Sequence, residues 1–309
     1  MEEYPTSMTG LEQRFAAQEA CLGYLATLRW PSGFVCPSCS SAKAWRMENG
    51  LILCADCRRQ QSVLAGTVFQ DSHMPLPTWF RAMWHICANK NGMSAQNLQR
   101  LLGLRSYNTA WLCLHKLRRA MVRSGRERLS GIIEADETYV GGPREGKRGR
   151  GAFGKQIVFI AAEVRGHKIG RIRLSHIPGV SGATLVPAVS EAVTAGATVR
   201  TDGWKGYNGV TAGGYKHEVA AENADELADI VLPKCHLVIS LLKRWILGTL
   251  QGNVGKDHLQ DYLNEFTFRF NRRNAKNRGL LFYRLAQLAV VTAPNPRSKI
   301  VPPQDIVAG

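Results

Sequence analysis

Hydrophobic residues recur with two different periods along this chain, and the change from one period to the other divides it. Residues 75–123 place apolar side chains at helical spacing, as in PLPTWFRAMWHICANK, where Trp79, Met83 and Ile86 share one face. From Leu129 onward, short β-branched runs separated by glycine-bearing turns replace that pattern. The sequence therefore predicts a helical middle segment followed by a strand-rich one.

Two predicted helices of the middle segment are separated by a glycine. The helix in MSAQNLQRLLGL begins after the N-cap Ser94 and stops at Gly103, and SYNTAWLCLHKLRRAM forms the next one. Such a pair is typical of a DNA-binding helix-turn-helix, although helix pairs are also common for other reasons. The residues expected to face bases are Tyr107, Asn108 and Thr109. The residues expected to hold phosphates are Lys116, Arg118 and Arg119.

The strand-rich segment predicts an α+β domain. Three short apolar runs, IIEADETYV, KQIVFIAAEV and RIRLSHI, indicate an antiparallel meander. A helix (SGATLVPAVSEAV), a strand (ATVRTD), a short run (YKHEVA) and a long helix (CHLVISLLKRWILGTLQG) follow. This order is that of a ribonuclease-H-like fold, which places carboxylates from its first and fourth strands side by side and a third metal-binding group on a later helix.

Two aspartates stand where predicted strands break off, Asp136 in GIIEADETYVGG and Asp202 in ATVRTDGWKGY. A lone aspartate at such a position is most often a turn-former, but a pair can hold divalent ions against a phosphodiester. Phosphoryl transfer with two ions needs them about 3.5–4 Å apart. We expect Asp136 to bridge both ions, Asp202 to bind one, and His236 to complete a shell. Lys243 lies two helical turns after His236, and we expect it to contact a DNA phosphate.

Four of the eight cysteines form two CxxC pairs near the start of the chain. The Asn49–Gly50 turn between the pairs fits a β-hairpin that carries them. Four thiolates at this spacing close tetrahedrally around zinc, which predicts a structural zinc ribbon with no position for a catalytic water. Four unrelated buried cysteines would not explain two equal spacings. The expected zinc ligands are Cys36, Cys39, Cys54 and Cys57.

The charge of the chain indicates a polyanionic partner. A net charge of +16 and a sequence pI near 9.8 favour nucleic acid, although a basic enzyme without such a partner stays open. The glycine-rich basic segment 141–155 is interpreted as a loop that holds DNA phosphates, or as a solvated loop. Further residues expected either to contact DNA or to form ordinary basic surface are Arg58, Arg59, Arg272 and Arg273.

The N-terminal segment and the cysteines outside the two pairs indicate the cellular compartment. The opening MEEYPTSMTG is acidic and polar, unlike a secretory signal. No apolar stretch approaches the ~20 residues that span a bilayer. The cysteines outside the two pairs stand among apolar neighbours and are expected to be buried thiols in a reducing environment. We therefore expect a cytoplasmic protein without membrane contact.

Five segments together resemble insertion-sequence transposases of the DDE recombinase superfamily: EADETYVGG, TDGWKGY, ISLLKRW, GTLQG and YLNEFTFRFNRR. Within it, the chain is similar to the zinc-ribbon group called insertion-sequence family fifteen-ninety-five, with its ISXO-like transposase domain. The likeness covers nearly the whole chain. It implies a prokaryotic, nucleoid-associated enzyme that cleaves double-stranded DNA at transposon ends and joins it to a target. Because two ends must be held together, a homo-oligomer is expected in the DNA complex.

The resemblance also implies roles for individual residues. Asp136 and Asp202 match the family's two aspartates, His236 takes the slot of the usual glutamate, and Lys243 matches the lysine that follows it. Imidazole binds Mn²⁺ more readily than Mg²⁺, so either ion is expected as catalytic cofactor, beside structural Zn²⁺. If the histidine slot is misassigned, Glu265 is the next candidate, against its reading as an ordinary helix glutamate.

These observations predict a multidomain α+β protein. The expected parts are an N-terminal helix and zinc ribbon (1–70), a helix-turn-helix domain (71–125), a ribonuclease-H-like catalytic domain (129–292) and a loosely ordered tail (293–309). The leading hypothesis is an active transposase. The alternatives are a catalytically decayed transposase that regulates by binding DNA, and a zinc-ribbon RNA-processing nuclease that hydrolyses without joining.

Overall fold

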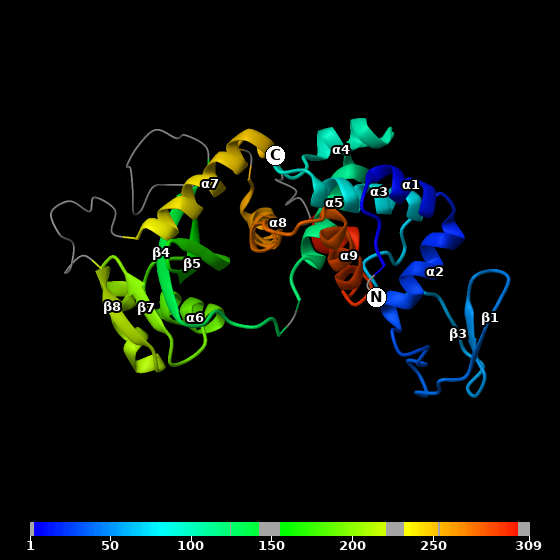
Figure 1. The fold of residues 1–309 in the computed structure, drawn as a ribbon, viewed down its shortest axis with the longest axis horizontal. Coiled ribbons are helices and arrows are strands. Elements are labelled where there is room, and N and C mark those ends of the chain that lie inside the picture. The colour runs from blue at the N-terminus through cyan, green and yellow to red at the C-terminus, as the bar shows by residue number, and fades with distance from the viewer. Residues whose placement is uncertain (1–2, 124, 142–154, 221–231, 253, 302–309) are drawn as a thin grey trace, which may run out of the picture. The chain divides into compact units, whose positions relative to one another are not determined.

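A computed structural model of the chain (Figure 1) describes residues 3–123, 125–141, 155–220, 232–252 and 254–301. The chain forms two compact units, one from residues 1–123 and 275–309 and the other from residues 124–274. Most of the basic segment 141–155 lies outside the described residues. None of the described helices is long and apolar enough to cross a membrane.

An aromatic cluster forms part of the core of the first unit. Phe15, Phe80 and Phe282 meet there, with ring centroids 4.7 Å apart for Phe15–Phe80 and 5.5 Å apart for Phe80–Phe282. Phe282 lies on α9, a helix expected in the domain of residues 129–292, and it brings that helix into the first unit instead. The described helices of this unit are α1 (Met8–Arg14), α2 (Gln18–Arg29), α3 (Leu76–Ala88), α4 (Ala95–Leu102), α5 (Tyr107–Ala120), α9 (Arg278–Ala289) and α10 (Arg297–Ile300).

Helices α4 and α5 begin and end where their capping residues predict. The Ser94 Oγ accepts from the Asn97 N–H at 3.2 Å, and Gly103 closes α4 in the left-handed conformation at φ 60°. The Ser106 Oγ caps α5 by accepting from the Asn108 N–H at 3.2 Å. The predicted limits of α4 are therefore confirmed.

The tail beyond residue 293 is more ordered than expected as far as residue 301. It includes α10, whose Ile300 is buried, and the Arg119 Nη1 donates to the Lys299 carbonyl at 3.2 Å. These contacts hold the segment to α5 within the first unit. Residues 302–309 lie outside the described residues.

The ribbon is a small antiparallel sheet in the order β1-β2-β3. Its turn is the predicted one: the Gly50 N–H donates to the Met47 carbonyl at 3.0 Å, and the φ of Gly50 is 79°. The Asn49 Oδ1 accepts from the Leu51 N–H at 3.1 Å. The strands are β1 (Ala44–Arg46), β2 (Ile52–Cys54) and β3 (Gln60–Gln61).

The second unit contains a five-stranded sheet in the order β6-β5-β4-β7-β8. The first three strands in sequence are antiparallel neighbours, which confirms the predicted meander, whereas β7 runs parallel to β4 and β8 parallel to β7. The strands are β4 (Ile132–Val140), β5 (Gln156–Arg165), β6 (Lys168–Ile177), β7 (Thr198–Thr201) and β8 (Lys216–Val219).

Helices cover both faces of this sheet (Figure 1). The α6 face buries Ile133 and Ala135 of β4, while the α7 and α8 face buries Ile160 and Ala162 of β5. Successive side chains of a strand point to opposite faces, so Glu134 and Asp136 belong to the face that α7 covers. The helices are α6 (Gly182–Ala192), α7 (Pro233–Leu250) and α8 (Leu259–Asn271).

Side chains from α8 bind the outer edge of β6. Asn271 accepts from the Ile172 N–H at 2.8 Å and donates to the Ile172 carbonyl at 3.1 Å. Gln260 accepts from the His176 N–H at 2.9 Å. These amides replace a neighbouring strand, which protects an edge that would otherwise pair with another chain.

Candidate metal centres and nucleic-acid contacts

The four cysteines of the ribbon form a closed cluster. Their sulfurs all lie within 4.8 Å of one another, with Cys36 and Cys57 Sγ atoms 3.6 Å apart and Cys39 and Cys54 Sγ atoms 3.5 Å apart. Zn–S bonds of ~2.3 Å in a tetrahedron would separate the sulfurs by roughly 3.8 Å. The donor set and spacing therefore fit a structural zinc ion.

The local backbone explains how the two cysteines of each CxxC pair come close enough to bind one ion. Ser40 and Arg58, which directly follow the two pairs, take left-handed conformations at φ 61° and 59° and so reverse the chain. The Ser38 backbone N–H lowers the pKa of Cys36 to about 6, with help from Cys39 and the neighbouring thiols. A thiolate stabilised in this way is the form that binds metal.

Asp136 lies inside β4, the central strand of the sheet, and is 9% exposed. The expectation that it stands where a strand breaks off is therefore wrong, because the residues that follow it continue to pair with β5 as far as Val140. Its Oδ1 accepts from the Glu137 N–H at 2.7 Å. Burial, together with the nearby charges of Glu137 and Asp202, raises the pKa of Asp136 to about 6, although that N–H and His236 oppose the shift. The surroundings of Asp136 therefore stabilise its ionised form poorly. A bound cation would supply the missing positive charge.

Asp202 follows the last residue of β7 and lies beside Asp136. In the parallel pair, Ile133 is opposite Val199 and Glu134 is opposite Arg200. Continuing this register by two residues brings Asp202 level with Asp136. The Asp202 Oδ1 accepts from the Trp204 N–H at 3.0 Å, so the residue also forms the turn after the strand.

Helix α7 supplies the third predicted ligand. The His236 Nε2 lies 3.6 Å from the Asp136 Oδ2, and the His236 side chain is 52% exposed. Lys243 is two turns further along α7; burial and Lys155 lower its pKa, and Asp136 opposes that shift. The structure thus brings Asp136, Asp202 and His236 together, with Lys243 within electrostatic range of Asp136.

This second centre is more open than the cysteine cluster. The ligand atoms of Asp136, Asp202 and His236 do not all fall within the 4.8 Å that encloses the four sulfurs. An ion such as Mg²⁺ keeps several waters and takes only one or two carboxylates from the protein. These three residues would therefore hold an ion only together with further ligands, such as water.

Glu265, the other candidate for the third ligand, is placed elsewhere. It is fully buried on α8, and its Oε1 lies 3.3 Å from the Arg269 Nε one turn along the same helix. The contact with Asp136 is made by His236.

Two acidic residues next to Asp136 were not identified from the sequence. The Glu134 Oε2 accepts from the backbone N–H groups of Lys234 at 2.7 Å and Cys235 at 2.9 Å. The Glu137 Oε2 accepts from the Tyr207 hydroxyl at 3.0 Å. Strand alternation in IIEADETYV places Glu134 on the same face as Asp136, but it does not reveal the partner about a hundred residues later.

The residues at the start of α5 are available to a ligand. Tyr107, Asn108 and Thr109 are exposed, and half of the Tyr107 surface is accessible. Arg118, by contrast, is 1% exposed and donates to the Met93 carbonyl at 3.0 Å. Its guanidinium stabilises the first unit and is not accessible to a phosphate.

The other basic residues differ in their exposure and in the contacts that they make. Lys116 is half-buried and Arg119 donates to the Asn295 side chain at 3.4 Å. Arg58 lies over the Trp45 ring at 5.6 Å, and Arg59 donates to the Ser38 hydroxyl at 3.1 Å on an exposed part of the ribbon.

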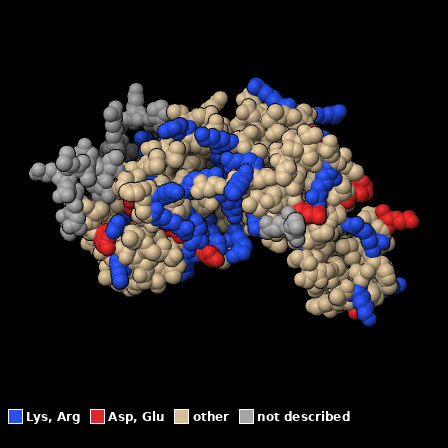
Figure 2. Space-filling view, viewed as in Figure 1, with Lys and Arg blue, Asp and Glu red and all other residues tan. Residues whose placement is uncertain are grey.

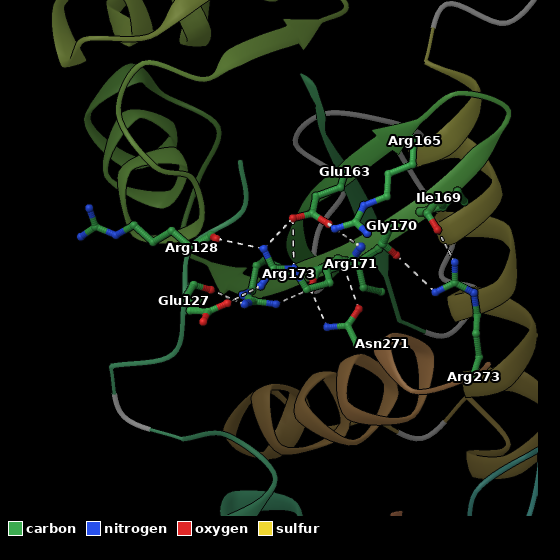
Figure 3. A network of polar contacts seen from close by, with 11 residues as sticks. Glu127, Arg128, Glu163, Arg165, Ile169, Gly170, Arg171, Arg173, Asn271 and Arg273 are labelled. Carbon is green, nitrogen blue, oxygen red and sulfur yellow. Dashed lines mark hydrogen bonds and ion pairs between the residues drawn. The ribbon is translucent and has the colours of Figure 1, made fainter. Parts of the chain in front are cut away.

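Arg273 braces the β5–β6 hairpin (Figure 3). It donates to the carbonyls of Ile169 and Gly170, the latter at 3.2 Å, and stacks on Phe270 at 4.1 Å. Arg272 similarly lies over Phe268 at 4.0 Å and donates to its carbonyl at 3.2 Å. These contacts assign Arg273 a structural role that the basic sequence pattern did not indicate.

Lys and Arg predominate over Asp and Glu on the face shown in Figure 2, on both units. This distribution agrees with the net charge of +16. A surface of this kind attracts polyanions at long range.

Comparison with known proteins identifies the family. Residues 16–60 match the family described as "Transposase zinc-ribbon domain", and residues 128–271 match "ISXO2-like transposase domain", which ends with the last residue of α8. A Halobacterium salinarum protein described as "Uncharacterized protein in transposable element ISH50" is 27% identical over 278 residues, covering 82% of this chain and 91% of its own length. The chain therefore belongs to the IS1595 family of insertion-sequence transposases, with both the zinc ribbon and the transposase domain of that family.

Proposed function

We propose that this protein is an active DNA transposase that binds the ends of its insertion sequence, cleaves DNA there and joins the freed end to a target. The observation that carries the proposal is that Asp136 of β4, Asp202 at the end of β7 and His236 of α7 come together. The strand order β6-β5-β4-β7-β8, with three antiparallel and then two parallel strands, supports a ribonuclease-H-like catalytic domain.

Each residue has a distinct part in this mechanism. Asp136 would bridge two divalent cations, and Asp202 and His236 would each hold one of them. When bound, the cations would activate the attacking oxygen and stabilise the leaving oxygen of the phosphodiester. Lys243 would contact a phosphate of the DNA from the same helix as His236. Because His236 occupies a slot where a carboxylate is usual, we expect Mn²⁺ to support the reaction better than Mg²⁺.

DNA recognition is assigned to the first unit, with a contribution from α8. In this proposal α4 and α5 act as a helix-turn-helix, and the zinc ribbon binds beside it. The proposed base contacts are Tyr107, Asn108 and Thr109. The proposed phosphate contacts are Arg58, Arg59, Lys116, Arg119 and Arg272; the buried Arg118 and the bracing Arg273 are left out. Two copies of the chain, one for each end of the element, would act together on DNA in a prokaryotic cytoplasm.

Strand transfer of a labelled end fragment into plasmid DNA tests the proposed activity. The full chain should join the fragment in the presence of Mn²⁺, and more slowly with Mg²⁺. Specific binding without cleavage in either ion would instead identify a decayed transposase that acts as a DNA-binding regulator. Cleavage without joining would identify a hydrolytic nuclease.

Binding to the end fragment should weaken steeply as salt rises. A protein that neutralises about 6–10 phosphates loses roughly 10³–10⁵ in affinity between about 50 and 200 mM salt, because the release of counterions from DNA gains less entropy in more concentrated salt. Fluorescence anisotropy over this range measures the slope. A nearly flat response would contradict an extended phosphate interface.

A further inference from the structure

The first turn of α7 has no cap of its own. Its N-cap residue is Leu232, whose side chain makes no capping hydrogen bond, and Pro233 follows at the first helical position. The first free backbone donors of a helix need partners, and a hydrophobic residue followed by proline supplies none. Here the unsatisfied donors are the N–H groups of Lys234 and Cys235, since the His236 N–H already donates to the Leu232 carbonyl at 3.0 Å.

A carboxylate from β4 caps the helix instead. The Oε2 of Glu134 accepts from both N–H groups, at 2.7 and 2.9 Å, and the side chain is almost fully buried. The Cys235 Sγ donates to the Glu134 carbonyl at 3.2 Å, which ties the same two residues together a second time. Charge-assisted hydrogen bonds at the positive end of a helix are among the stronger polar contacts in proteins.

This junction joins the two elements that carry the candidate metal ligands. Asp136 is two residues after Glu134 on β4, on the same face, and His236 directly follows Cys235 on α7. The position of the His236 imidazole, 3.6 Å from Asp136, therefore depends on how the first turn of α7 is held against β4. Lys234 adds a tie to the β5–β6 turn by donating from its Nζ to the His167 carbonyl at 3.0 Å.

We infer that Glu134 is a positioning residue of the metal centre: it caps α7 from the strand that bears Asp136 and thereby sets His236 at bonding distance for a shared divalent cation. This inference rests on the proposed function, because it assigns Glu134 a role in the same centre. Glu134 itself does not bind the cation, since its carboxylate is buried against the helix. Partners that orient a metal ligand typically account for about 10–100-fold in metal affinity.

Mn²⁺ binding and hydrogen exchange, measured on the full-length protein, test the inference. In Glu134→Ala, the backbone amides at the start of α7 should exchange faster, and Mn²⁺ affinity, followed by electron paramagnetic resonance of free Mn²⁺, should fall about 10–100-fold. Glu134→Gln, which keeps an acceptor oxygen in place, should restore most of both. The matched control is Glu163→Ala on the neighbouring strand β5, which removes an equally buried carboxylate that binds Arg171 and not α7. It should leave both measurements unchanged.

A double-variant comparison separates positioning from general destabilisation. If Glu134 acts through the imidazole, Glu134→Ala should weaken Mn²⁺ binding in the wild-type background and have little effect in a His236→Ala background. An equal loss in both backgrounds, or an equal loss in Glu163→Ala, would overturn the positioning role. Wild-type protein that binds no Mn²⁺ would refute the proposed metal centre, whereas unchanged exchange at α7 in Glu134→Ala would refute the cap itself.

Discussion

Asp136→Asn is expected to abolish strand transfer while leaving DNA binding nearly intact. The substitution keeps the shape of the side chain and the oxygen that accepts from the Glu137 N–H, but it removes the charge proposed to bridge two cations. A catalytic metal ion contributes several kcal/mol to transition-state stabilisation, and about 1.36 kcal/mol corresponds to a tenfold change in rate. The rate of joining should therefore fall by at least roughly 10²–10³-fold in the labelled-fragment assay.

The same variant should be more stable than the wild type at neutral pH when no divalent cation is present. The pKa of Asp136 is raised by burial from its ordinary value of 3.8 to about 6, so ionising it disfavours the folded state. The cost begins as pH rises above the ordinary pKa and is fully present above pH 6; it amounts to about 2–3 kcal/mol. Asparagine cannot ionise, so urea unfolding should show the gain at pH 7 and no gain at pH 3.

A matched control distinguishes this effect from a change in overall charge. Asp257→Asn removes one negative charge from an exposed position in the same unit and should alter neither strand transfer nor stability. Loss of DNA binding in Asp136→Asn equal to its loss of joining would contradict the division of labour between the two units. A destabilised Asp136→Asn protein at pH 7 would contradict the electrostatic description of the site.

Removal of zinc should unfold the ribbon. Its sheet has three short strands, and few of their side chains are buried, so little apolar burial opposes the entropy of the chain. A structural zinc ion bound by cysteines contributes apparent free energies of about 10–16 kcal/mol at pH 7, which then dominate folding of the module. Cys36→Ser, or treatment with a chelator, should make residues 36–61 sensitive to protease and weaken binding to the end fragment.

Zinc content and proteolysis together check this expectation. Wild-type protein should hold one zinc per chain, and Cys36→Ser should hold much less. Cys113→Ala is the control, because that thiol is buried in α5 outside the cluster and its loss should leave the zinc in place. A Cys36→Ser protein that keeps a full zinc complement and a protease-resistant ribbon would show that the metal does not maintain the fold.

Local sequence patterns determined much of this protein. The two CxxC pairs lie close together in the chain, and the Asn49–Gly50 turn between them lets one pair approach the other. Ser94 and Gly103 set the limits of α4 because capping depends on residues within one turn. The order of strands and helices in the second unit follows from periodicity in the same way, and it indicates which aspartates end up at neighbouring strands.

Other features depend on residues far apart in the chain. Arg118 has the same chemistry as an exposed DNA-binding arginine, yet packing of the first unit buries it against the Met93 carbonyl. Helix α9 belongs to the first unit because the ring of Phe282 packs against Phe15, which directly follows α1, and against Phe80 of α3. Neighbouring residues in the sequence predict neither the burial of Arg118 nor the position of α9. Both depend on packing against residues that are distant in the chain.

The candidate metal centre depends on both local sequence and tertiary structure. The sequence by itself indicated the candidate ligands and placed Asp202 at a strand end and His236 near the start of a helix, whereas Asp136, which was also expected at a strand end, lies inside β4. Only the tertiary structure decided that Glu134, about a hundred residues before α7, supplies the cap that this helix lacks and holds His236 next to Asp136. The physical reason is that the unsatisfied N–H groups of a helix can donate to any carboxylate that folding brings to them, and the sequence around Leu232 and Pro233 shows only that an acceptor is needed.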